Sequence, residues 1–170
     1  MRDFFYQRRN YIHELDVAAE EMTSRMRMHS ADIRRGIAQR LSDAHGVTIV
    51  TRVDMGDHVL HNFDPETRRL DISNALSAGG HTFRLAAELA YLEFGDLLDG
   101  LVAEGNFSDD TSRSLALTGL ASYFAAAALS VPLWVRAVAR FGLARCWLAG
   151  MLLAIVVFCW AGTLGRGDIA

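Results

Sequence analysis

The chain of 170 residues contains no lysine, only two cysteines and only two prolines. Two cysteines, Cys146 and Cys159, are too few for a disulfide scaffold. Two prolines and no low-complexity run argue against a disordered chain. The net charge of −3 excludes a protein that binds nucleic acid through positive charge alone. A chain of this length has room for one hydrophobic core but not for two full domains.

Charge is unevenly distributed along the chain. Residues 1–113 hold 13 arginines and 19 acidic residues, whereas residues 114–170 hold 4 arginines and a single acid, Asp168. All three tryptophans lie in the second part. The charged first residues lack the apolar core of a signal peptide, so we expect a cytoplasmic start. The first part is typical of a soluble domain, and the last part is different in character.

The N-terminal third predicts two amphipathic helices. Residues 2–28 place apolar side chains at three- and four-residue steps, opposite a charged face. Residues 31–44 repeat this pattern, with Ser30 as a candidate N-cap and Gly46 as a candidate C-cap. The apolar stripe of this second helix has three members: Ile33, Ile37 and Leu41.

Three short segments then predict strands: residues 47–53, 58–63 and 69–73. A turn that begins at Asp64, with proline in its second position, separates the last two. We expect a small antiparallel sheet with helices packed on it, hence an α+β fold. His58 and His61 lie three apart on a strand, so they point to opposite faces and are poor candidates to share a metal.

Helical patterns return after a break at Ser77-Ala-Gly-Gly80. Residues 81–94 carry a leucine stripe, and residues 109–130 are rich in alanine and uncharged after Arg113. Ser108 or Asp109 can cap the second of these helices, and Pro132 is expected to end it. An uncharged, alanine-rich helix next to an amphipathic one is expected to be part of the core.

Residues 146–164 contain no charge and no proline. As a helix, this segment would span roughly 28 Å, close to the ~30 Å hydrocarbon core of a bilayer. Trp147 and Trp160 lie near its ends, and three arginines precede it, which would keep the rest of the chain cytoplasmic. A transmembrane helix is therefore the favoured interpretation, and a buried core helix is the alternative.

Glu88 occupies the glutamate position of an H-E-x-x-H pattern, in which two histidines bind zinc and the glutamate activates water. The two histidine positions hold Ala87 and Tyr91. Alanine cannot bind a metal, and tyrosine has an unperturbed pKa near ~10. The alternative without a functional role is an ion pair between Glu88 and Arg84 on one helix face.

Five segments around this motif carry a family resemblance. They are Arg2–Tyr6 with Asn10–Asp16, Arg69–Leu76, Phe83–Ala90, Leu92–Asp99, and Gly119–Leu129 with Val131-Pro132. Over residues 1–132 the chain resembles the IrrE/ImmA-like domain, which has a zincin-type fold. More closely, it is similar to the middle region of actinobacterial helix-turn-helix regulators of short-chain fatty acyl metabolism, of the acetate/glyoxylate type.

The departures from the family pattern matter as much as the matches. All three metal ligands of the family are absent. Ala87 and Tyr91 replace the two histidines, and the region that aligns with the third ligand, Leu117–Leu120, holds no carboxylate. The resemblance therefore implies a degenerate zincin-like domain without metal, cofactor or peptidase activity. It also implies a small metabolite, such as a short-chain acyl-CoA, as the ligand, and we expect Arg84, Glu88 and Tyr91 to line its pocket. No helix-turn-helix precedes the domain in this sequence, so we expect no direct DNA binding.

The sequence thus predicts two parts. Residues 1–132 form the regulatory domain, with connector helices in 1–45, the sheet in 47–73 and the core helices in 81–130; residues 133–170 form a hydrophobic tail. The leading hypothesis is a non-enzymatic sensing module of a truncated transcriptional regulator. One alternative is a single-span, tail-anchored membrane protein with a cytoplasmic partner-binding domain. Another is that the tail is the out-of-frame translation of a GC-rich gene. The sequence does not specify an oligomeric state.

Overall fold

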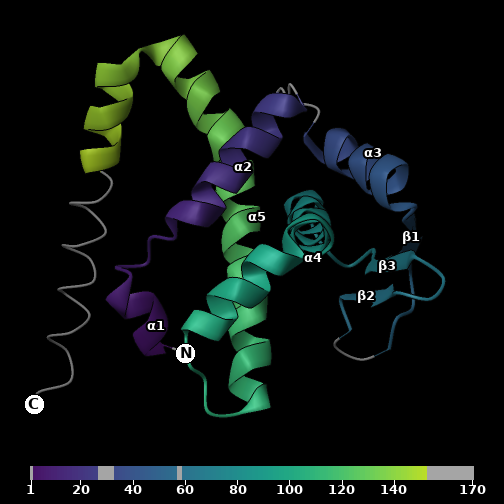
Figure 1. The fold of residues 1–170 in the computed structure, drawn as a ribbon. Coiled ribbons are helices and arrows are strands. Elements are labelled where there is room, and N and C mark those ends of the chain that lie inside the picture. The colour runs from purple at the N-terminus through teal and green to yellow at the C-terminus, as the bar shows by residue number, and fades with distance from the viewer. Residues whose placement is uncertain (1, 27–32, 57–58, 153–170) are drawn as a thin grey trace, which may run out of the picture. The chain divides into compact units, whose positions relative to one another are not determined.

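The computed structural model describes residues 2–26, 33–56 and 59–152 (Figure 1). The chain divides into two compact units, Met1–Pro132 and Leu133–Ala170. The predicted N-cap Ser30 and the histidine His58 lie outside the described residues. The candidate site lies entirely in the first unit.

The N-terminal region forms two helices instead of the single helix predicted over 2–28. α1 is Arg2–Gln7, and α2 is His13–Arg25. Between them, Arg9 and Asn10 adopt left-handed backbone conformations with φ of 53° and 56°. The Asn10 amide donates a 2.8 Å hydrogen bond back to the carbonyl of Phe5, which closes α1 in the manner of a helix C-terminal motif. The periodic pattern did not reveal this break because both helices present apolar residues at helical spacing.

α3 is Ile33–His45, and its predicted stripe is confirmed. Ile33, Ile37 and Leu41 are all buried. Gly46 follows with φ of +65°, the left-handed conformation that a side chain disfavours, and so ends the helix where predicted.

The sheet has three strands: β1 (Thr48–Arg52), β2 (His61–Asp64) and β3 (Arg69–Ser73). Their order is β1-β3-β2, with β2 antiparallel and β1 parallel to β3. The prediction of a purely antiparallel sheet is therefore wrong for β1. β3 carries two completely buried side chains, Leu70 and Ile72, and this most buried strand takes the central position.

α4 runs from Ala78 to Glu104 and is longer than predicted at both ends. Ser77 caps it by accepting a 3.1 Å hydrogen bond from the Gly80 amide, so the two glycines lie in the first turn rather than in a break. The helix bends at Phe94 (φ −122°, ψ 22°) and continues past Gly95, because Leu98 and Leu101 extend its buried face.

α5 runs from Asp110 to Phe141. Asp109 is its N-cap, since its carboxylate accepts a 2.7 Å hydrogen bond from the Ser112 amide. The prediction that Pro132 ends this helix is wrong, because the helix continues for nine more residues. A proline removes one backbone hydrogen bond from a helix, and a long flanking helical sequence can bridge that gap.

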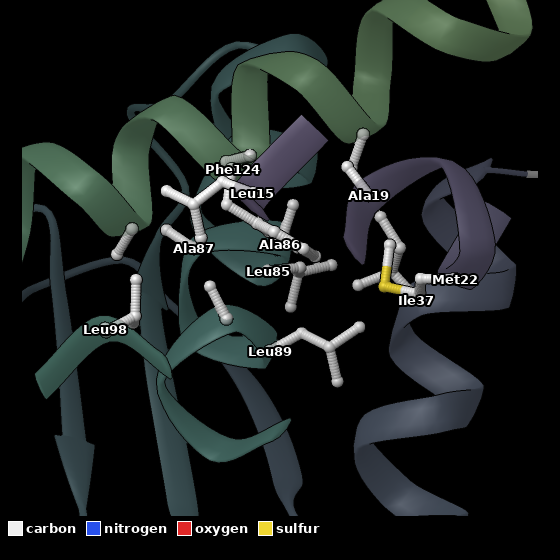
Figure 2. Packing of buried hydrophobic residues seen from close by; sticks show 14 of the residues in the cluster. Leu15, Ala19, Met22, Ile37, Leu85, Ala86, Ala87, Leu89, Leu98 and Phe124 are labelled. Atoms are coloured by element: carbon white, nitrogen blue, oxygen red, sulfur yellow. The ribbon is translucent and has the colours of Figure 1, made fainter. Parts of the chain in front are cut away.

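One cluster of buried side chains joins α2, α3, α4, α5 and the sheet. In Figure 2, Leu85 and Leu89 of α4 lie between Phe124 of α5 and Ile37 of α3. The kink of α4 lies beside this cluster, because the rings of Phe94 and Phe124 are 4.8 Å apart. The core is thus mainly helical, and the sheet contributes to it chiefly through β3.

Only part of the predicted transmembrane helix 146–164 can be compared with the structure. Residues 146–152 belong to a helix that spans Leu143–Leu152, and residues 153–164 lie outside the described residues. By length and composition, the segment Asp110–Val131 of α5 could also cross a membrane. Its side chains Leu120, Phe124 and Ala128 are completely buried in the core, whereas 33% of the apolar window as a whole is buried.

Tyr123 links α5 to the first turn of α2. Its hydroxyl donates a 3.0 Å hydrogen bond to the Asp16 carboxylate and accepts a 3.3 Å bond from the Ile12 amide. We expect Tyr123→Phe to lower the free energy of unfolding by about 1–2 kcal/mol, because both partners lose a bond. Urea denaturation followed by circular dichroism measures the change.

Tyr91→Phe is the matched control, because Tyr91 is half-buried and its hydroxyl makes no hydrogen bond within the described residues. Equal losses in the two variants would contradict a structural role for the Tyr123 hydroxyl.

Candidate functional site

Four polar side chains line one side of α4. His81, Arg84, Glu88 and Tyr91 follow one another at steps of three, four and three residues. With 3.6 residues per turn, they fall within about 80° of one another around the helix axis. We call these four residues the polar row. The sequence predicted three of its members, and the same spacing would also have identified His81.

Burial distinguishes the members of the polar row. His81 and Glu88 are buried, with 8% and 6% of their surfaces exposed, whereas Arg84 and Tyr91 are half-buried. Buried ionisable groups are rare in proteins unless a partner compensates them. The polar row is therefore an unusual feature of a helix whose neighbouring positions, Leu85 to Ala90, are otherwise apolar and buried.

Glu88 has no such partner. The predicted alternative, an ion pair with Arg84, is not formed, and Glu88 makes no hydrogen bond or ion pair with any described residue. Among the described residues, every fully buried side-chain oxygen or nitrogen atom has a hydrogen-bond partner. The unpartnered oxygens of Glu88 therefore reach the small opening that leaves the residue 6% exposed. Burial raises the pKa of Glu88 to about 7, so near neutral pH the group can donate a proton as well as accept one.

His61 of β2 lies close to the polar row. Its pKa is lowered from the usual value by burial and by the positive charge of Arg84. This histidine is therefore neutral at physiological pH. The proximity of His61 and Arg84 could not be predicted from the sequence. The two residues are 23 positions apart, one on a strand and one on a helix, and residue spacing indicates contacts only within one helix or strand.

The site does not fit a catalytic zinc ion. The positions that flank Glu88 as potential ligands hold Ala87 and Tyr91. Within the described ranges, no three His, Cys, Asp or Glu side chains lie close enough together to hold a metal. A zinc peptidase requires three protein ligands and an activated water, so these residues offer no basis for that chemistry.

Two cavities of the first unit lie next to other parts of α4. A cavity of about 570 Å³ lies between the end of α4 and the start of α5, lined by Asp99, Phe107 and Arg113 among others. A second, of about 240 Å³, lies between α2 and α4 and is bordered by Arg40 and Glu93. Neither of these two cavities is lined by Arg84, Glu88 or Tyr91. The predicted pocket beneath α4 therefore stays a prediction.

The relatives of this chain are transcriptional regulators. It is 57% identical over 127 residues to the HTH-type transcriptional regulator RamB of Mycobacterium tuberculosis, a match that covers 75% of this chain and 27% of RamB. It is 35% identical over 129 residues to the regulator PrpR of the same species, covering 76% of this chain and 26% of PrpR. It is also 29% identical over 137 residues to the propionyl-CoA carboxylase regulator of Cereibacter sphaeroides, a match that covers 76% of this chain and 26% of that regulator.

A solved structure of a Mycobacterium tuberculosis transcriptional regulator has the same fold. It superposes with a TM-score of 0.71 at 35% sequence identity, over 75% of this chain and 38% of that one. The chain spans about a quarter of the length of the curated relatives it matches. The family model of the IrrE N-terminal-like domain, Peptidase_M78, matches residues 42–133, more than half of the sequence. The resemblance inferred from the sequence is thus confirmed, and the chain belongs to the family of IrrE N-terminal-like domains.

Proposed function

We propose that residues 1–132 are a non-enzymatic sensing module of a transcriptional regulator of short-chain acyl metabolism. The relatives support a regulatory role, since they are named as transcriptional regulators. The substitutions at Ala87 and Tyr91 support the absence of peptidase chemistry, because they remove two of the side chains that would hold zinc. DNA recognition would then belong to another polypeptide segment, which agrees with the acidic charge of residues 1–113.

The observation that carries the proposal is the largely buried carboxyl group of Glu88, whose oxygens reach a small opening and make no hydrogen bond with any described residue. A ligand that enters this opening can pair with the carboxyl group without breaking an existing hydrogen bond or ion pair. A hydrogen bond to such a group contributes about 1–3 kcal/mol. In its protonated form, Glu88 would donate a hydrogen bond to a carbonyl oxygen of the ligand.

The other members of the polar row suit the same ligand. Arg84 has no hydrogen-bonded partner among the described residues, and it would bind the phosphate groups of a nucleotide carrier. Tyr91 offers a phenol beside an apolar surface, which suits a short acyl chain. A short-chain acyl-CoA combines a carbonyl group, an apolar tail and phosphates. One relative is named as a regulator of propionyl-CoA carboxylase, which supports this ligand class.

Isothermal titration and thermal unfolding of the full chain with acetyl-, propionyl- and butyryl-CoA test the proposal. A ligand at 100 times its Kd adds about 2.7 kcal/mol of stability, which should raise Tm by roughly 5–10 °C. Arg84→Gln should weaken binding about tenfold or more through the loss of a charge-assisted hydrogen bond. Arg34→Gln, an exposed arginine on α3, is the matched control and should bind as the wild type does.

Free CoA and octanoyl-CoA complete the experiment, because a module that senses short acyl chains should bind both of them more weakly. An absence of heat and of stabilisation with all three short-chain ligands would disprove the proposal. Stoichiometric zinc in the purified protein would contradict its non-enzymatic part.

A further inference from the structure

The second unit exposes an unusual amount of apolar surface. Eight large apolar side chains between positions 134 and 152 are exposed, from 48% for Trp134 to 62% for Trp147 and Leu152. The full set is Trp134, Val135, Phe141, Leu143, Trp147, Leu148, Met151 and Leu152. Single exposed apolar residues are normal on soluble proteins, but a run of this density marks an interaction surface.

These side chains belong to two helical segments joined at Gly142. The last turns of α5 form the first segment, and Leu143–Leu152 forms the second (Figure 1, light green and yellow-green). Gly142 has φ of +80°, which permits the reversal between them. A shallow apolar cavity of about 440 Å³ lies between the segments, bordered by Trp134, Phe141 and Ala149.

The charge of this region has one sign only. Arg136, Arg140 and Arg145 are its charged residues, and no acid occurs between Asp110 and Asp168. Arg140 and Arg145 are exposed and make no ion pair within the part of the chain that the structure describes. The Arg140 guanidinium lies 5.6 Å from the ring centre of Phe141. Cationic groups thus alternate with aromatic and aliphatic ones on the same surface.

We propose that residues 134–152 are a docking surface for a lipid bilayer with anionic headgroups. Apolar and tryptophan side chains favour the boundary between headgroups and acyl chains, and arginines favour the anionic headgroups directly above it. A second copy of the same surface would supply apolar contacts but would bring its arginines against like charges. The charge pattern therefore favours lipid over self-association. The proposal does not depend on the acyl-CoA hypothesis, which concerns the first unit.

Vesicle binding by the full chain tests this proposal. All three tryptophans of the protein lie in residues 133–170, so their fluorescence reports on this part of the chain alone. With vesicles of phosphatidylcholine and phosphatidylglycerol (3:1), we expect co-sedimentation and a blue shift of the emission. Pure phosphatidylcholine vesicles should bind at least tenfold more weakly, and 0.5 M NaCl should reverse much of the difference.

Paired variants separate electrostatic docking from non-specific adhesion. Arg140→Gln with Arg145→Gln should reduce partitioning into anionic vesicles about 25-fold, at roughly fivefold for each cation. Arg34→Gln with Arg113→Gln makes the same change of net charge on exposed arginines of the first unit and should have little effect. Trp147→Ser should weaken binding to both kinds of vesicle, because it removes apolar contact.

The outcomes discriminate between possible partners. Failure to bind anionic vesicles, or equal binding by the two double variants, would overturn the proposal. Concentration-dependent self-association without lipid binding would also overturn it and would indicate a second copy of the chain as the partner. Lipid binding that resists carbonate washing would support deep insertion, whereas binding released by carbonate would support docking at the headgroup level.

Discussion

Phe124→Ala is expected to lower the free energy of unfolding by about 3–5 kcal/mol. Phe124 is completely buried, and its ring contacts that of Phe94 where α4 bends. Removal of the ring leaves a cavity between α4 and α5 that the surrounding leucines cannot fill without moving the helices. Since domains are stable by only about 5–15 kcal/mol, this single change brings the domain close to unfolding.

Urea denaturation followed by far-ultraviolet circular dichroism measures the effect. Phe141→Ala is the matched control, because it removes the same side chain from the same helix at a position that is 54% exposed. The control should change the unfolding midpoint by much less. A loss below 1 kcal/mol for Phe124→Ala would mean that α5 does not pack in the core as described.

Glu88→Gln is expected to stabilise the domain at alkaline pH and to change little at pH 5. The pKa of Glu88 is raised from 4.5 to about 7 in the folded state by burial. Between these two values the unfolded chain releases the proton while the folded chain retains it, so stability falls as the pH rises. The fall amounts to about 3 kcal/mol, at 1.36 kcal/mol for each unit of pKa, and it is complete above pH 7. A neutral glutamine does not titrate and avoids this loss.

Urea unfolding of both proteins at intervals from pH 4.5 to 8.5 measures the difference. Glu20→Gln, an exposed glutamate of α2, is the control and should leave the pH profile of the wild type unchanged. Parallel profiles for the wild type and Glu88→Gln would show that Glu88 is ionised and solvated in the folded state.

The sequence correctly predicted the helices whose spacing of apolar residues and end signals depend only on residues a few positions away. The stripe of α3 and its end at Gly46 followed from spacing and from one glycine, and both are confirmed. The class of fold was also correct. Pairing of β1 with β3 rather than with β2 depends on which strand can bury most apolar surface among the helices, and local sequence does not record this choice.

The candidate site was likewise predicted in part: its helical spacing followed from the sequence, whereas its contacts with other elements did not. Helical spacing placed Arg84, Glu88 and Tyr91 on one side of α4 from sequence alone. The same spacing suggested an ion pair between Arg84 and Glu88, which the described residues do not form. Arg84 instead lies close enough to His61 of β2 for its charge to lower the pKa of that histidine. The extent of burial at Glu88 was also beyond prediction, since it depends on side chains that other helices contribute.

The order of the strands has a consequence for folding during synthesis. β2 and β3 are joined by a four-residue turn, so their hairpin closes over a short loop. Thr48 of β1 instead pairs with Arg69, 21 residues further along the chain. On the ribosome, β1 therefore emerges well before β3, the neighbour that satisfies its backbone hydrogen bonds. The sheet is expected to assemble from the late hairpin towards the early edge strand, in the reverse order of translation.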